Sequence, residues 1–142
     1  MFKSLEKHSV KYVVIGGIAS VLHGVPRATF DLDILIEADE RNVKNLLAAF
    51  FDAGLGTADL ITPEELLKNE ITVFKDSVRI DVQTFTPGLV FREAWENKGT
   101  IKNQDYTLFI LSRQDLIRSK TAAGREVDME DVRILQNNEK SG

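Results

Sequence analysis

Residues 11–37, KYVVIGGIASVLHGVPRATFDLDILIE, contain the segments that decide the fold of this chain. Lys11 to Ile15 is a β-branched run that stops at Gly16-Gly17, which predicts a buried strand ending in a tight turn. Ile18 to His23 fits a short helix, since a glycine and a proline follow it. Phe30 to Glu37 predicts a second strand. The stretch therefore predicts two strands joined through a glycine turn and a short helix.

The second predicted strand carries two carboxylates at alternate positions. Because successive side chains of a strand point to opposite faces, Asp31 and Asp33 share one face while Leu32 points to the other. Two such carboxylates can converge on a hard cation, and without one they repel and raise each other's pKa. The alternative is the solvated face of an edge strand. The apolar run from Ile34 to Ile36 weakens that alternative, because it indicates a central strand.

Two further features each allow a structural and a functional interpretation. Gly16-Gly17 would let backbone N–H groups approach a phosphate, or would only serve the geometry of the turn. Asp81 falls on the polar face of the run Val78 to Thr84. It would join the other carboxylates, or it would form an ion pair with Arg79 on the same face.

The rest of the chain predicts a mixed α/β (α+β) fold with a sheet of about four to five strands and helices packed on it. Apolar spacing, proline and capping signatures predict five further helices and three further strands. The predicted helices are Asp39–Gly54, Thr62–Asn69, Leu89–Glu96, Ser112–Gly124 and Glu126–Gln136, and the predicted strands are Ile71–Phe74, Val78–Thr84 and Tyr106–Leu111. We expect a single domain over 1–142, with a core over about 11–111 and C-terminal helices over about 112–136.

Composition narrows the functional classes. The chain has 142 residues, 18 Lys+Arg against 22 Asp+Glu, a net charge of −4 and no cysteine. Disulfide frameworks, thiolate nucleophiles and cysteine-ligated zinc are therefore excluded. The acidic balance argues against broad non-specific binding of nucleic acid, although residues 98–125 carry six Lys/Arg against two Asp. No apolar stretch is long enough to span a bilayer, so we expect a soluble, cytoplasmic protein with no membrane partner.

Taken together, the motifs resemble the nucleotidyltransferase superfamily of the DNA polymerase β type. The resemblance rests on Gly16-Gly17, the apolar-flanked pair Asp31-Leu32-Asp33-Ile34, and a later single aspartate, Asp81. The segment from Asp115 to Asp131 also resembles the minimal, abortive-infection toxin-like branch of that superfamily. The similarity spans about residues 11–135 and implies a nucleotidyltransferase-like fold.

The resemblance implies a two-metal site and a set of phosphate contacts. Asp31, Asp33 and Asp81 would be catalytic and would hold Mg²⁺ or Mn²⁺, as oxygen-only ligands suit these ions. Phosphate contacts would come from the amides of Gly16 and Gly17, from Arg27, and from Lys120, whose neighbours three and four residues away are not acidic. Arg125 is expected to pair with Asp128 on the same helix.

The resemblance leaves the acceptor open. It implies transfer of a nucleoside monophosphate from an NTP, such as ATP, to a hydroxyl of a tRNA, a protein or a small molecule. The alternative is a non-catalytic nucleotide-binding component of a toxin–antitoxin-type pair, acting with a partner protein. The presence of all three carboxylates favours the enzyme.

Overall fold

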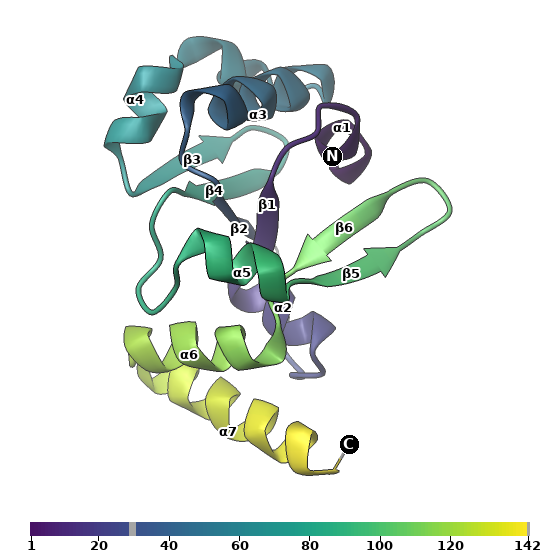
Figure 1. The fold of residues 1–142 in the computed structure, drawn as a ribbon, viewed down its shortest axis with the longest axis vertical. Helices are drawn as coiled ribbons and strands as arrows, with labels where there is room; N and C mark the ends of the chain where they lie inside the picture. Colours follow the sequence, from purple (N-terminus) through teal and green to yellow (C-terminus); the bar gives the residue numbers. More distant parts are fainter. Residues whose placement is uncertain (29–30, 142) are drawn as a thin grey trace.

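The described residues form a six-stranded mixed sheet in the order β3-β4-β2-β1-β6-β5 (Figure 1). The computed structural model describes residues 1–28 and 31–141. The strands are β1 Tyr12–Ile15, β2 Leu32–Ile36, β3 Ile71–Lys75, β4 Arg79–Gln83, β5 Gly99–Lys102 and β6 Thr107–Ile110. The helices are α1 Phe2–Lys7, α2 Gly16–Leu22, α3 Glu40–Asp52, the 3-10 turn η1 Gly56–Leu60, α4 Pro63–Lys68, α5 Phe91–Asn97, α6 Arg113–Ala123 and α7 Glu126–Ser141.

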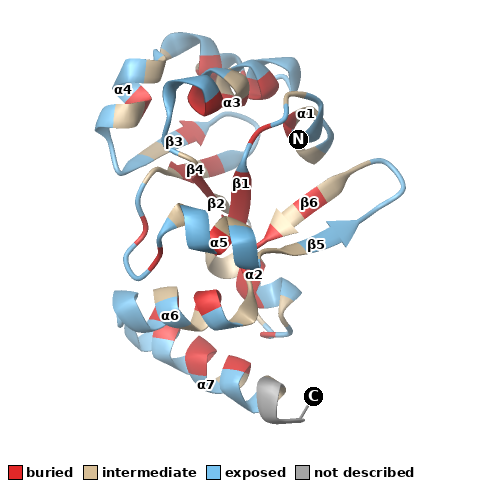
Figure 2. Cartoon of the chain, viewed as in Figure 1, coloured by how far each residue is buried: buried red, intermediate tan, exposed pale blue. Residues whose placement is uncertain are grey.

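The centre of the sheet aligns the strands that carry the aspartates. β1 pairs antiparallel with β2 and parallel with β6, while β2 pairs parallel with β4. All four residues of β1 are buried, which explains its uninterrupted β-branched sequence. Figure 2 shows the buried positions concentrated on β1, β2 and β4 and on parts of α3.

Helices cover the sheet and extend beyond one end of it. α3 packs against β3 through a Phe50–Phe74 aromatic contact, and α1 packs against β1 through Phe2 and Tyr12. α6 and α7 lie side by side as a helical hairpin next to α2 (Figure 1). The hairpin thus approaches the end of the sheet where β1 passes into α2.

The predicted mixed α/β fold class is confirmed, with differences at the level of elements. The sheet has one strand more than expected, because β5 was not predicted: three of its four residues are exposed and it contains a single large apolar side chain. The first helix after β1 begins at Gly16 itself rather than at Ile18. The second strand begins at Leu32, and the predicted start at Phe30 lies outside the described residues.

The short helix η1 was also not predicted. No helix within the described part of the chain is both long enough and apolar enough to cross a membrane.

Candidate active site

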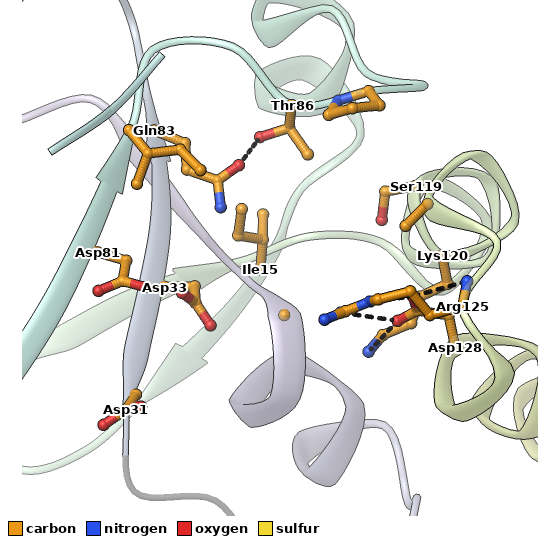
Figure 3. Close-up of a pocket in the computed structure, with 14 residues that line it drawn as sticks. Ile15, Asp31, Asp33, Asp81, Gln83, Thr86, Ser119, Lys120, Arg125 and Asp128 are labelled. Carbon is orange, nitrogen blue, oxygen red and sulfur yellow. Dashed lines mark hydrogen bonds and ion pairs between the residues drawn. The ribbon is translucent and has the colours of Figure 1, made fainter. Parts of the chain in front are cut away.

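Two of the three predicted carboxylates are direct neighbours across the sheet. Asp33 of β2 is the register partner of Asp81 of β4, so both side chains leave the same face. Asp31 lies one residue before β2 and is exposed. Figure 3 shows the three aspartates, hereafter the carboxylate row, along one side of a cavity. The alternation and strand placement predicted from sequence do bring them together.

The environment of Asp33 disfavours its charge. The pKa of Asp33 is raised to about 6, mainly by burial and then by the negative charge and hydrogen bond of Asp81 and the charge of Asp31, while Arg79 opposes the rise. A half-buried carboxylate with two anionic neighbours is stabilised by any cation that enters the row. The perturbed pKa marks Asp33 as a candidate functional group on electrostatic grounds.

Arg79 forms the ion pair that the sequence offered as the alternative interpretation of Asp81. Its Nε donates to Asp81 Oδ1 at 3.0 Å and its Nη2 to Asp81 Oδ2 at 3.4 Å. The same Nε lies 4.0 Å from Asp31 Oδ2. The pKa of Arg79 is raised by the hydrogen bond and charge of Asp81. Asp81 therefore forms the ion pair with Arg79 and also belongs to the carboxylate row.

Gly16 lies against Asp33 where α2 begins. Its φ is +69°, a left-handed backbone conformation that side chains other than glycine rarely adopt. A Cβ at this position would lie 2.5 Å from Asp33 Oδ2, so a larger residue would displace the carboxylate. Gly16 lines the cavity, while Gly17 is not among the described residues that do so. Glycine is therefore required at position 16, where it lets the backbone pass beside the carboxylate of Asp33.

The wall opposite the carboxylate row carries basic side chains from α6 and from the turn between α6 and α7. Lys120 and Arg125 line the cavity together with Ser119 and Asp128 (Figure 3). The cavity has a volume of about 470 Å³ and is bounded on the row's side by Asp31, Asp33 and Asp81. One side is therefore acidic and the other carries two cationic groups.

Lys120 has no acidic neighbour at helical spacing, as the sequence indicates, but the fold gives it two acidic partners. Lys120 is 6% exposed, and its Nζ lies 2.9 Å from Asp131 and 3.5 Å from Asp128. Both partners lie on the next helix, eight and eleven residues away, so a search at helical spacing could not find them. Lys120 joins α6 to α7 and also borders the cavity.

Arg125 pairs with Asp128, as predicted. Its Nε lies 2.7 Å from Asp128 Oδ2, and Nη2 lies 3.2 Å from Oδ1. Burial opposes the charge of Asp128, but Arg125 and Lys120 outweigh that effect and hold its pKa below the usual range. Arg125 remains 72% exposed, so its guanidinium borders both the cavity and solvent.

Arg27 is directed to the same ion-pair cluster rather than to the cavity. Its Nη1 donates to Asp131 Oδ2 at 2.9 Å, and Ser20 Oγ lies 3.4 Å from the same oxygen. Arg27 is not among the described residues that line the cavity. Thr29, two residues after Arg27, lies outside the described residues.

Sequence reasoning missed several other residues of the cavity. Gln83 lines it from β4, two residues after Asp81 on the same face, and accepts a 2.6 Å hydrogen bond from the buried Thr86. The period-two pattern that identified Asp81 could have identified Gln83. Ser119 and Ile71 also line it, and only the tertiary arrangement reveals them.

The donor chemistry of the carboxylate row fits a hard divalent cation, because aspartate supplies oxygen atoms alone. As the side chains stand, no three His, Cys, Asp or Glu residues within 1–28 and 31–138 are arranged to hold a metal ion. Asp81 is instead held by Arg79. The residues are suitable for a cation, and the guanidinium of Arg79 occupies hydrogen-bonding positions on Asp81.

Comparisons with known proteins agree with the motif resemblance. Residues 2–137 match the family described as "Nucleotidyltransferase of unknown function (DUF6036)". Among solved structures, the chain is similar to an antigenic nucleotidyltransferase-like protein from Paracoccidioides brasiliensis, with a TM-score of 0.52 and 17% sequence identity over 94% of this chain and 70% of that chain. At this identity the similarity shows the fold alone. No curated protein matches the chain in sequence.

Proposed function

The chain belongs to the nucleotidyltransferase family DUF6036, and from this premise we propose that it is a magnesium-dependent enzyme. It transfers a nucleoside monophosphate from an NTP to a hydroxyl group. The observation that carries the proposal is the cavity with the carboxylate row on one wall and Lys120 and Arg125 on the other. A triphosphate with a bound divalent cation matches both walls, because its phosphates are anionic and its metal is cationic.

Asp31, Asp33 and Asp81 are the residues that would hold Mg²⁺ or Mn²⁺. When bound, such ions bind the triphosphate and lower the pKa of the acceptor hydroxyl. Gly16 keeps the backbone of α2 close to Asp33, and we retain its amide, with that of Gly17, as a proposed phosphate contact. Asp81, at the far side of Asp33 from β1, is proposed to serve the acceptor side of the reaction and to receive its proton.

Lys120 and Arg125 are proposed to bind phosphate from the opposite wall. Arg125 is the more accessible of the two, and Asp128 orients its guanidinium through two hydrogen bonds. Lys120 is buried and supplies its charge from within the α6–α7 junction. This changes the expectation from sequence, in which Arg27 and Lys120, but not Arg125, were the basic side chains assigned to phosphate. Arg27 is left as an indirect contributor through Asp131.

The acceptor is proposed only as a class. A tRNA, a protein side chain or a small molecule each supplies the required hydroxyl, and ATP is a suitable donor nucleotide. We retain the proposal that 1–142 is one minimal catalytic domain, with a core over about 11–111 and C-terminal helices over about 112–136. We also propose, as the alternative to catalysis, that the protein is a cytoplasmic nucleotide-binding component of a toxin–antitoxin-type pair and acts with a partner protein.

The experiment follows labelled phosphate from an NTP into acceptors in a cell extract containing Mg²⁺. Compared with extract alone, the added protein should increase transfer of an α-³²P label to RNA, protein or a small molecule and should not increase transfer of a γ-³²P label. Asp81→Asn should reduce transfer roughly a hundredfold or more and leave NTP affinity within a few-fold. Retained transfer in that variant would reassign Asp81 to the Arg79 ion pair alone. NTP binding with no transfer in any extract would favour the non-catalytic alternative.

A further inference from the structure

The carboxylate row contains three acidic groups and, at bonding distance, one basic group. Arg79 contacts Asp81 with two nitrogens at 3.0 and 3.4 Å, and it approaches Asp31 at 4.0 Å. Its positive charge also opposes the raised pKa of Asp33. One guanidinium therefore acts on all three carboxylates.

Strand register places Arg79 there. Leu32 pairs with Ile80 and Asp33 with Asp81, and extending this register by one residue sets Asp31 opposite Arg79. Arg79 and Asp81 lie two residues apart, so their side chains share the face of β4 that carries the row. A side chain fixed at this position by the sheet lies next to the row in every folded molecule.

We propose that Arg79 is the resident counter-cation of the carboxylate row, and that it must release Asp81 before a divalent cation binds there. This inference rests on the proposed metal-dependent function and adds a positioning residue to it. The same carboxylate oxygens that would ligate the cation accept the hydrogen bonds of Arg79. Cation binding and the Arg79–Asp81 pair therefore compete for the same oxygens.

A role confined to fold stability accounts poorly for this contact. The side chain of Arg79 is 44% exposed, and ion pairs with exposed partners contribute little to folding. The pair instead lies where three like charges would otherwise face one another without compensation. Its removal should therefore change cation binding far more than the free energy of unfolding.

The first test measures Mn²⁺ affinity of the full chain by electron paramagnetic resonance, without nucleotide, so that it does not depend on activity. Arg79→Gln should bind Mn²⁺ roughly tenfold more tightly than wild type, since a charge-assisted hydrogen bond no longer competes. Lys75→Gln is the matched control, because Lys75 is the register partner of Arg79 on β3 and carries the same charge on the same face. Its affinity should stay within about twofold of wild type, as expected for a charge lost without a lost contact.

The outcomes separate the inference from the proposed function. Equal Mn²⁺ affinity in wild type and Arg79→Gln, or an equal gain in Lys75→Gln, would overturn the counter-cation role and leave the metal site standing. Weaker binding by Arg79→Gln would overturn it as well. If neither wild type nor Arg79→Gln binds Mn²⁺, while both give the same unfolding curve, the proposed metal-dependent function fails too.

A second measurement follows the pair itself. The Nε–H resonance of Arg79, assigned by its absence in Arg79→Lys, should shift as diamagnetic Mg²⁺ is added and should reach a plateau as the site saturates. An Nε–H resonance that stays unchanged at saturating Mg²⁺ would show that the pair persists in the metal-bound protein and would overturn the inference.

Discussion

Asp33 lies between Ile15 of β1 and Asp81 of β4 in the sheet register, with Gly16 packed on its carboxylate. Because its pKa is about 6 in the folded protein against an ordinary 3.8, the folded state binds more protons than the unfolded state between these pH values. Metal-free stability should therefore fall as pH rises from about 4 to 6. Below pH 4, Asp33 is protonated in both states and does not lower the stability. Above pH 6, it is ionised in both states and the folded protein carries the full free-energy cost of its charge.

Asp33→Asn should remove that cost. We expect the variant to be more stable than wild type by about 1–2 kcal/mol at pH 7.5, allowing for solvent screening at a half-buried site, and similar to wild type at pH 3.5. Urea unfolding at both pH values measures the difference. Asp105→Asn, in the exposed turn between β5 and β6, should show no such pH-dependent gain. A gain of equal size at both pH values would contradict the electrostatic explanation.

At the scale of single residues, the sequence predicted the features that depend on neighbours two or three residues away, namely the faces of side chains and the local ion pairs. The shared face of Asp31 and Asp33, the polar face of Asp81 and the Arg79 and Arg125 pairs all follow from spacings of two or three residues. Lys120 does not, because its partners lie on another helix. A charge without a local partner in sequence can still be fully paired in the fold.

The junction between β1 and α2 is the element on which the site geometry depends. Gly16→Ala should strain the backbone and also displace Asp33, since the added Cβ would lie 2.5 Å from Oδ2. Gly54→Ala is the matched control: its φ is +90°, and no atom lies within 4 Å of the added Cβ. Both variants should lose about 1–2 kcal/mol from positive φ, and only Gly16→Ala should also lose Mn²⁺ affinity. Isothermal titration and urea unfolding measure the two effects, and equal Mn²⁺ affinity in the two variants would contradict the role of Gly16.

At the scale of elements, capping signals were the most informative local features. Thr62 and Glu65 form the predicted capping box at the start of α4, and Ser112 accepts from the amide of Asp115 at the start of α6. β5 escaped prediction because pairing with β6, rather than an apolar face of its own, makes it a strand. Elements fixed by side-chain-to-backbone contacts are visible in sequence, whereas elements fixed by a distant partner are not.

At the scale of the whole molecule, buried ion pairs hold the α6–α7 hairpin together and thereby place the basic wall of the cavity. Lys120→Met should cost about 3 kcal/mol, since the buried Asp128 and Asp131 lose their shared cation and keep only Arg125 and Arg27, respectively. Arg125→Gln should cost at most about 1 kcal/mol, because its side chain is largely exposed. Chemical denaturation of both variants tests this order, and equal losses would contradict it. Arg125→Gln is consequently the cleaner probe of phosphate binding.

The face on which each aspartate lies was predictable from patterns within single strands, whereas the neighbouring positions of Asp33 and Asp81 depend on the pairing of β2 with β4 and were implied only by the family resemblance. The cavity was not predictable, since it forms only where α6 and α7 meet the end of the sheet. The opposed acidic and basic walls are therefore a property of the whole molecule.

The central claim is that this cavity binds a nucleoside triphosphate together with a divalent cation. The most direct measurement is calorimetric titration of a non-hydrolysable ATP analogue into wild type and Asp33→Asn, each with Mg²⁺ and with EDTA. Wild type should bind at least roughly tenfold more tightly with Mg²⁺, and Asp33→Asn should lose that dependence while remaining folded. Equal binding by both proteins, with and without Mg²⁺, would contradict the account.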